Sequence, residues 1–115
     1  LFIGYHAGAT NPDGILAYTF RSASLRQVLV NGVSAPESLI NAAIAGHFDT
    51  PVLLVSGDDI CIAETQGILP DIEGVTVKCA HSRLSARTIR SEQWAESPNP
   101  PPMVMPDRSA RTRLG

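Results

Sequence analysis

Residues 51–59 of the chain read PVLLVSGDD, a near-continuous apolar run that ends in small and acidic residues. Such a run is typical of a strand that is covered on both faces of a sheet. Residues 56–59 are expected to turn the chain into a helix that runs through Ala63 to about Leu69, where a proline stops it. Residues 75–79 alternate in a way that predicts another strand. Strand, helix and strand at these lengths indicate βαβ crossovers in a mostly parallel sheet, and therefore an α/β fold.

Two more elements are predicted upstream of this unit. Ile40, Ile44 and Phe48 recur every four residues, which predicts an amphipathic helix over residues 35–48 with an apolar face for the core. Asn31-Gly32 follows a short apolar run and is a strong hairpin signal, because both residues tolerate a positive φ. The sequence therefore adds a short hairpin and a second helix to the parallel sheet.

The chain opens with mostly apolar residues, 1–5, which predict a short buried strand. His6 then lies just past the carboxyl end of this strand, where ligand crevices form in open α/β sheets. Residues 15–20 are apolar enough for another short strand or for a buried segment. His6 is thus the first candidate for a functional side chain.

Glu37 is the second candidate, because it projects from the first turn of the helix over residues 35–48. Imidazole and carboxylate groups are both zinc ligands, so His6 and Glu37 could share a metal ion. Each residue also has a structural interpretation. A lone His at a strand end can be a hydrogen-bonded structural residue, and Ser34 and Glu37 have the spacing of a capping box. Spacing alone leaves both interpretations open.

Composition narrows the possible functions. The chain has 115 residues with a formal net charge of −2, which suits one small domain and gives no electrostatic footprint for nucleic acid. No apolar run approaches the ~20 residues of a membrane span, and the first residues do not resemble a signal peptide. Two cysteines, Cys61 and Cys79, fit a reducing cytoplasm better than a disulfide framework. We therefore expect a cytoplasmic protein that binds neither membrane nor nucleic acid.

Asp58 and Asp59 form an acidic pair at the end of the strand over residues 51–55. The pair could hold a metal or act as acid and base. The structural alternative is that one Asp caps the following helix while the other favours the helix dipole. We favour the structural alternative, because no His lies near in sequence. His47 and His81 are expected to be surface residues.

The sequence closely resembles the DppA family of zinc D-aminopeptidases over residues 1–89. The matching pieces follow in order and are Gly4-Tyr5-His6-Ala7, residues 14–20, 30–32, 37–41, 45–46 and 51–59, and Val77-Lys78 with Ser82-Arg83. This resemblance implies an α/β fold and a zinc centre that removes amino-terminal D-residues from short peptides by metal-assisted amide hydrolysis. It also implies a homo-oligomer that encloses its active sites.

The resemblance assigns roles to individual residues. His6 matches the ligand in the Gly-Tyr-His-Ala motif of the family, and Glu37 matches the ligand carboxylate that opens the following helix. Tyr18 stands where the family has a catalytic His. A phenol can donate a hydrogen bond to an oxyanion, but it is a poor base at neutral pH because it ionises only near pH ~10.

The resemblance also implies that the chain is incomplete as an enzyme. The Asp-x-Glu-Gly ligand pair and a further ligand His of the family lie upstream of the residues present here. We divide the chain into a partial D-aminopeptidase-like domain, residues 1–89, and a Pro- and Arg-rich tail, residues 90–115, which we expect to be extended or disordered. We expect this chain alone to be inactive. The alternative is a non-catalytic peptide-binding or assembly module on the same scaffold.

Overall fold

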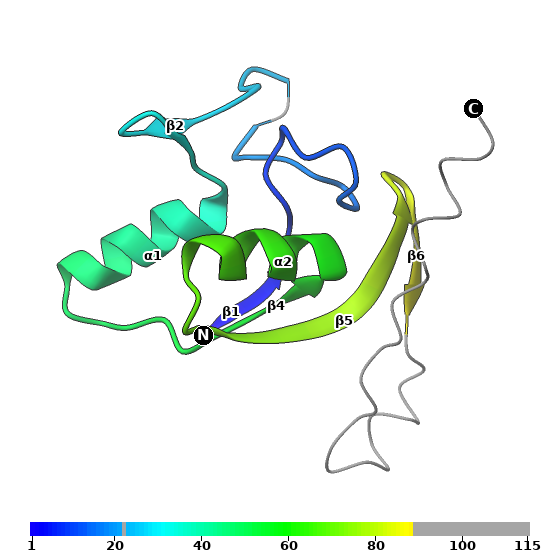
Figure 1. The fold of residues 1–115 in the computed structure, drawn as a ribbon. Coiled ribbons are helices and arrows are strands. Elements are labelled where there is room, and N and C mark those ends of the chain that lie inside the picture. The colour runs from blue at the N-terminus through cyan, green and yellow to red at the C-terminus, as the bar shows by residue number, and fades with distance from the viewer. Residues whose placement is uncertain (22, 89–115) are drawn as a thin grey trace, which may run out of the picture.

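The structure, a computed structural model, describes residues 1–21 and 23–88. The strands of this part are β1 (Phe2–Tyr5), β2 (Leu29–Val30), β3 (Val33–Ser34), β4 (Leu54–Asp58), β5 (Glu73–Ser82) and β6 (Ser85–Thr88), and the helices are α1 (Glu37–His47) and α2 (Asp59–Ile68) (Figure 1). One sheet has the order β1-β4-β5-β6, and β2 pairs with β3 separately. The predicted tail over residues 90–115 and the domain boundary at residue 89 lie outside the described residues.

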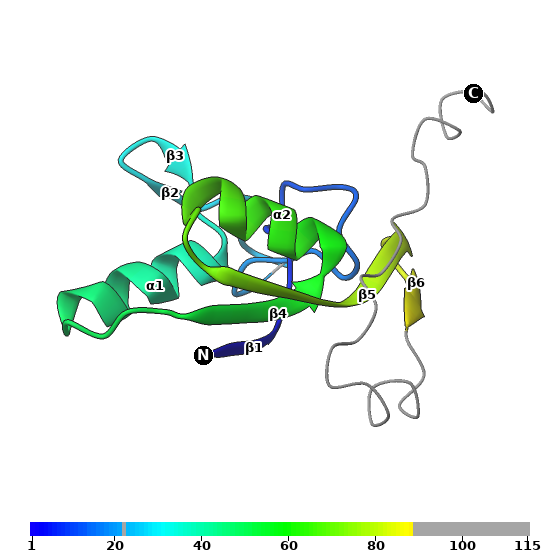
Figure 2. The ribbon, with the colours of Figure 1, turned by 60° about the horizontal axis from the view of Figure 1, so that its bottom comes forward.

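The centre of the main sheet is parallel. β4 lies between β1 and β5 and is parallel to both, and α2 makes the crossover from β4 to β5. Figure 2 shows α2 lying over one face of this sheet, with α1 beside it. The predicted α/β fold with a mostly parallel sheet and a short hairpin is therefore confirmed. β6, which the sequence pattern did not predict, pairs antiparallel to β5 and ends the sheet.

The β2–β3 hairpin turns at the two residues that predicted it. Asn31 and Gly32 have φ angles of 51° and 80°, the left-handed conformation that a tight hairpin turn needs at both central positions. Each strand has only two residues, so the hairpin is shorter than the preceding apolar run suggested. Residues 15–20, in contrast, form no strand. They agree with the other alternative, a buried segment, in that Ile15, Ala17 and Thr19 are buried.

The junction between β4 and α2 differs from the turn predicted over residues 56–59. β4 continues to Asp58, and α2 begins at the next residue. The direct transition is possible because Asp58 Oδ1 accepts hydrogen bonds of 2.9 Å from the N–H groups of Ile60 and Cys61. Asp58 therefore satisfies two amides of the first helical turn, and no separate turn is needed.

The core lies between α2 and the sheet. One cluster of buried residues contains Val55, Ile62 and Ile72, and the other contains Ala7, Ala17 and Cys61. The second cluster joins the loop after His6, the segment before Tyr18 and the first turn of α2. These three parts of the chain are therefore held together by burial of apolar surface.

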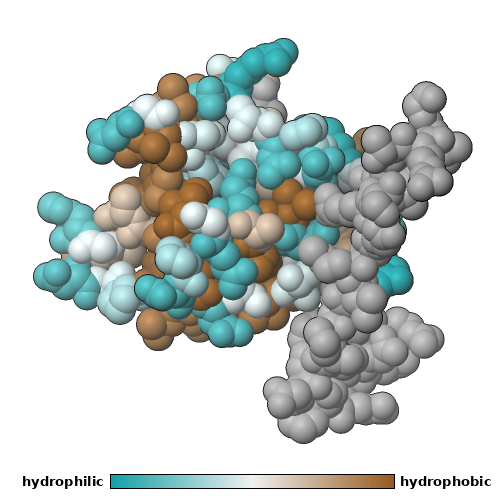
Figure 3. Space-filling view, in the orientation of Figure 1, coloured by the Kyte–Doolittle hydropathy of each residue, from teal (hydrophilic) through white to brown (hydrophobic). Residues whose placement is uncertain are grey.

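Two predicted apolar faces are less buried than expected. On α1, Ile40 is half-buried but Ile44 is 54% exposed, and Phe48, which follows the helix, is 71% exposed. β1 was predicted to be buried, yet it is an edge strand, and its flanking residue Leu1 and its own Ile3 are 78% and 70% exposed. Within the described residues, nothing pairs with the outer edge of β1. Figure 3 shows further hydrophobic residues gathered over the β2–β3 hairpin.

Candidate metal centre

His6 directly follows β1, as predicted, and is half-buried. Its ring lies against the ring of Tyr18, with a centroid separation of 5.1 Å and an interplanar angle of 58°. β4, the parallel neighbour of β1, ends nearby at Asp58. His6 therefore lies at the carboxyl edge of the parallel strands, the edge at which α/β folds bind ligands.

The backbone after His6 is fixed by hydrogen bonds from two other parts of the fold. The Gly8 N–H donates to Glu64 Oε2 of α2 at 2.7 Å, and the Ala9 N–H donates to Thr19 Oγ1 at 3.1 Å. The Tyr18 N–H in turn donates to the Ala7 carbonyl at 3.1 Å. These bonds restrict the backbone of residues 7–9, the small-residue loop after His6. The backbone that carries the imidazole is therefore held in one conformation.

Glu37 is the first residue of α1, but it does not act in a capping box. The N-cap of α1 is Pro36, without a side-chain cap, and Ser34 belongs to β3. Glu37 Oε1 instead accepts a hydrogen bond of 2.6 Å from the Phe20 N–H. The capping-box interpretation is therefore wrong. The carboxylate points to the segment that contains Tyr18, not back along its own helix.

His6 and Glu37 thus contact the same short stretch of chain, residues 18–20, which we call the bridging segment. The imidazole lies against Tyr18, and the carboxylate binds the amide of Phe20. The Cα atoms of two residues that are two apart in sequence lie at most ~7 Å from each other. Two side chains that are 31 positions apart in the sequence therefore approach one local structure.

Backbone strain marks this part of the fold. Phe20 has a φ of 53° and Leu16 a φ of 47°, both in the left-handed region that residues other than glycine rarely adopt. Such residues cost about 1–3 kcal/mol each and are often found at functional sites. The amides of both residues are satisfied from distant elements, that of Phe20 by Glu37 and that of Leu16 by the Arg83 carbonyl. Tertiary contacts therefore hold the bridging segment in shape.

The donor set is partial. Within residues 1–21 and 23–88 no three His, Cys, Asp or Glu side chains are grouped so that they could hold a metal ion. Catalytic zinc usually takes three protein ligands. His6 and Glu37 offer one nitrogen and one oxygen donor of the kinds that zinc accepts, so the chemistry fits zinc but the number of donors does not complete a site. Their role as ligands stays a prediction.

The acidic pair after β4 is structural. Asp58 caps α2, as described above, and Asp59 Oδ1 accepts a hydrogen bond of 2.7 Å from the Ala80 N–H of β5. Both side chains are buried, and Asp58 Oδ2 has no hydrogen-bond partner in the described structure. The predicted capping by one Asp is confirmed for Asp58, and the predicted effect of the other on the helix dipole stays a prediction. His47 and His81 are exposed, as predicted.

The thiol of Cys61 is inert for a physical reason. Burial, with a smaller contribution from the Asp58 carboxylate, raises the pKa of Cys61 from 9.0 to about 12. A thiol with such a pKa carries almost no thiolate at neutral pH, and thiolate is the reactive form. Cys61 and Cys79 are both buried and neither forms a disulfide, so neither is a candidate nucleophile.

Three residues support the site without having been predicted. Glu64 holds the amide of Gly8, Thr19 holds the amide of Ala9, and Arg83 Nη1 donates to the Ala17 carbonyl at 3.0 Å. Each bond joins residues at least 10 positions apart in the sequence. Local spacing carries no signal for such pairs. Thr19 and Arg83 lie within the pieces that resemble the family, whereas Glu64 does not.

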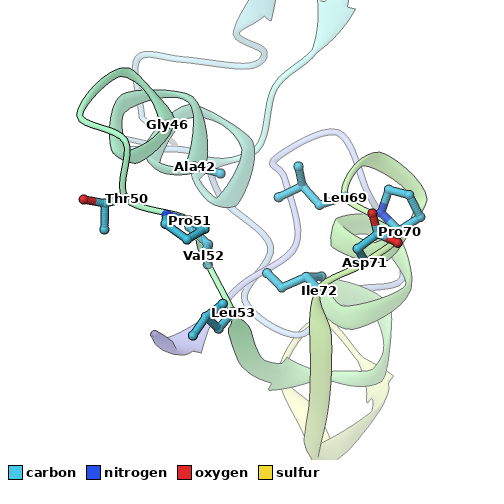
Figure 4. A pocket seen from close by; sticks show the side chains of 10 residues that line it. All are labelled: Ala42, Gly46, Thr50, Pro51, Val52, Leu53, Leu69, Pro70, Asp71 and Ile72. Carbon is cyan, nitrogen blue, oxygen red and sulfur yellow. The ribbon is translucent and has the colours of Figure 1, made fainter.

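The described residues line a cavity at each end of the sheet. One, of about 400 Å³, is shown in Figure 4, between α1 and the connection from α2 to β5, and is lined by residues such as Ala42, Val52, Leu69 and Ile72. Because β4 and β5 begin there, this cavity is at the far end from His6. The other, of about 460 Å³, is partly walled by Ala9 and Ala17, close to the candidate centre.

His6 at the carboxyl edge of the parallel strands and Glu37, which binds the neighbouring segment, are of donor types that zinc accepts. Residues 1–98 match the peptidase family M55, the D-aminopeptidases, and the chain belongs to this family. It is 34% identical over 89 residues to the D-aminopeptidase of Bacillus subtilis strain 168, in a match covering 77% of this chain and 32% of that protein.

A solved structure of a D-aminopeptidase also resembles this chain. The fold is similar, with a TM-score of 0.71 and 32% identity, to the Zn-dependent D-aminopeptidase DppA from Bacillus subtilis, which is described as a self-compartmentalizing protease. This match covers 75% of the chain and 31% of that protein. The chain thus spans about a third of the length of both relatives. Separately, no helix among the described residues is long and apolar enough to cross a membrane.

Proposed function

We propose that this chain contributes His6 and Glu37 to a zinc centre that hydrolyses amino-terminal D-residues from short peptides. The observation that carries the proposal is their shared contact with the bridging segment, where the imidazole meets Tyr18 and the carboxylate meets Phe20. The relatives support the metal and the reaction, since one is a Zn-dependent D-aminopeptidase. Zinc, when bound, supplies a Lewis acid that polarises the amide carbonyl.

The residues of this chain would do the positioning. His6 and Glu37 would hold the metal, and the loop of residues 7–9 would keep the imidazole in place through Glu64 and Thr19. Tyr18, whose ring lies on His6, would offer its hydroxyl as a hydrogen-bond donor to negative charge that develops on the substrate. Any further metal ligands would come from outside the described residues.

Titration calorimetry with zinc tests this proposal directly. The full chain should bind zinc weakly, because the described residues supply only two suitable donors, and His6→Ala should abolish that binding. His47→Ala, which removes an exposed imidazole at the end of α1, serves as the control and should leave zinc affinity unchanged. Unchanged zinc affinity in His6→Ala would remove the ligand assignment. We expect no measurable turnover of D-peptides by the chain alone.

A second candidate function is a peptide-binding or assembly module without catalysis. The partial donor set and the Tyr at position 18 favour it. The self-compartmentalizing relative makes a homo-oligomer the natural assembly to propose for either function. The two functions differ in their dependence on metal, because a binding module should hold a short D-peptide equally well with and without a chelator.

A further inference from the structure

The cavity of about 460 Å³ beside the candidate centre has two arginines and no acidic residue among the described residues that line it. Its lining consists of Ala9, Thr10, Ala17, Leu25, Arg26 and Arg83. Within residues 1–21 and 23–88, two guanidinium groups and no carboxylate line this cavity, so its described wall is positively charged in a chain whose net charge is −2. Such a concavity is suited to an anionic group.

The Arg83 guanidinium is held in place. Its Nη1 donates to the Ala17 carbonyl at 3.0 Å, and the carbonyl of the same residue accepts from the Leu16 N–H at 2.8 Å. The turn between β5 and β6 is thus docked on the residues that lead into the bridging segment. A guanidinium has five N–H donors in a planar fork, so one bond to Ala17 leaves donors for a planar anion such as a carboxylate.

The cavity lies next to the candidate centre along the chain. Ala17 directly precedes Tyr18, whose ring lies 5.1 Å from that of His6, and Ala9 lies three residues after His6. Adjacent Cα atoms are 3.8 Å apart, and an extended peptide advances ~3.3–3.6 Å per residue. The Cα atoms of His6 and Ala9 are therefore at most about 11 Å apart, a span that an extended peptide of two or three residues can cover.

We infer that Arg26 and Arg83 bind the carboxyl-terminal carboxylate of a short peptide whose amino end reaches the metal centre. This inference rests on the proposed function and extends it, because it names Arg26 and Arg83 as the residues that select short substrates. A carboxylate held at this distance from the centre fits peptides of two or three residues. Longer peptides would place their carboxylate beyond the cavity, and peptides with an amidated end would lack the charge.

Binding of D-alanylglycine and of its carboxyl-terminal amide tests the inference in the presence of a chelator. Proton–nitrogen NMR titration of the full chain should show at least tenfold tighter binding of the acid, with shifts at Ala9, Thr10 and Ala17. Arg26→Gln should bring the two affinities within about twofold of each other. Arg83→Lys should weaken the preference, because an ammonium keeps the charge but loses the bidentate fork.

Arg87→Gln is the matched control, because Arg87 is an exposed arginine of β6 that does not line the cavity. It should leave the preference for the acid unchanged. Equal affinity for acid and amide in the unmodified chain would overturn the inference, as would a preference that survives Arg26→Gln. Because the assay contains no free zinc, its outcome is independent of the zinc titration that tests the metal centre. Arg26 is exposed, so Arg26→Gln should fold normally. This variant therefore provides the test even if Arg83→Lys fails to fold.

Discussion

The Glu37 carboxylate accepts a hydrogen bond of 2.6 Å from the backbone N–H of Phe20, 17 residues earlier in the chain. Phe20 holds a left-handed φ of 53°, so this bond stabilises a conformation that is costly by itself. The same carboxylate is the proposed metal ligand. Glu37 therefore has a structural duty as well as a chemical one, and substitutions can separate the two.

Glu37→Ala should lower the free energy of unfolding by about 1 kcal/mol, because the Phe20 amide loses its acceptor. Glu37→Gln keeps a carbonyl oxygen at the same place and should cost clearly less. Zinc affinity should fall in both variants, since neither retains a carboxylate. Urea denaturation measures the first effect. Equal destabilisation by Ala and Gln would show that the hydrogen bond to Phe20 contributes nothing to stability.

Cys61 should resist alkylation by iodoacetamide at pH 7–8, because burial raises its pKa to about 12. The raised pKa also predicts a pH dependence of stability. The unfolded chain releases the thiol proton near pH 9, whereas the folded chain holds it until about pH 12, so stability is full below pH 9 and declines as the pH rises through this window. Rapid alkylation of the folded chain at neutral pH would contradict the buried state of Cys61.

Asp58→Asn should lower the pKa of Cys61, because the Asp58 carboxylate is one of the causes that raise it. The thiolate absorbance near 240 nm, followed against pH, measures this shift. Asn is also a good N-cap, so the variant should stay folded, whereas Asp58→Ala should lose about 0.5–2 kcal/mol of stability with the cap of α2. A pKa of Cys61 that does not change in Asp58→Asn would show that burial alone sets it.

Gly57→Ala should destabilise the sheet strongly, by about 2 kcal/mol or more. A Cβ atom at Gly57 would lie 2.7 Å from the Tyr5 carbonyl oxygen and 3.0 Å from Cys61 Sγ, so β1 or α2 would have to move. Gly67→Ala in α2 is the matched control, because nothing lies within 4 Å of its Cβ position, and it should stabilise the helix by about 0.5–1 kcal/mol. Thermal unfolding of both variants compares them. Similar melting temperatures would contradict the close approach of β1 to β4.

Sequence patterns predicted the elements whose signals are local. The apolar run before Asp58, the helix-like spacing of Ile40 and Ile44, and the Asn31-Gly32 turn each correspond to an observed strand, helix or hairpin. Burial was harder to predict, because the exposure of Ile44 and of β1 depends on which surfaces meet in three dimensions.

For the candidate site, sequence placed His6 correctly at a strand end but could not show what Glu37 contacts. The capping box was a reasonable local expectation, and it failed because the partner of Glu37 is Phe20, across a loop. The contributions of Thr19, Glu64 and Arg83 depend equally on contacts between distant segments. Long-range hydrogen bonds are set by the packed fold, so no spacing rule could reveal them.

The central claim is that His6 and Glu37 bind one and the same zinc ion. A double-mutant cycle in zinc affinity, measured by calorimetry on the full chain, His6→Ala, Glu37→Gln and the double variant, tests it most directly. If both side chains share an ion, each single variant should lose nearly all binding and the double variant should lose little more. Additive losses, or an affinity that Glu37→Gln leaves unchanged, would contradict a shared metal centre.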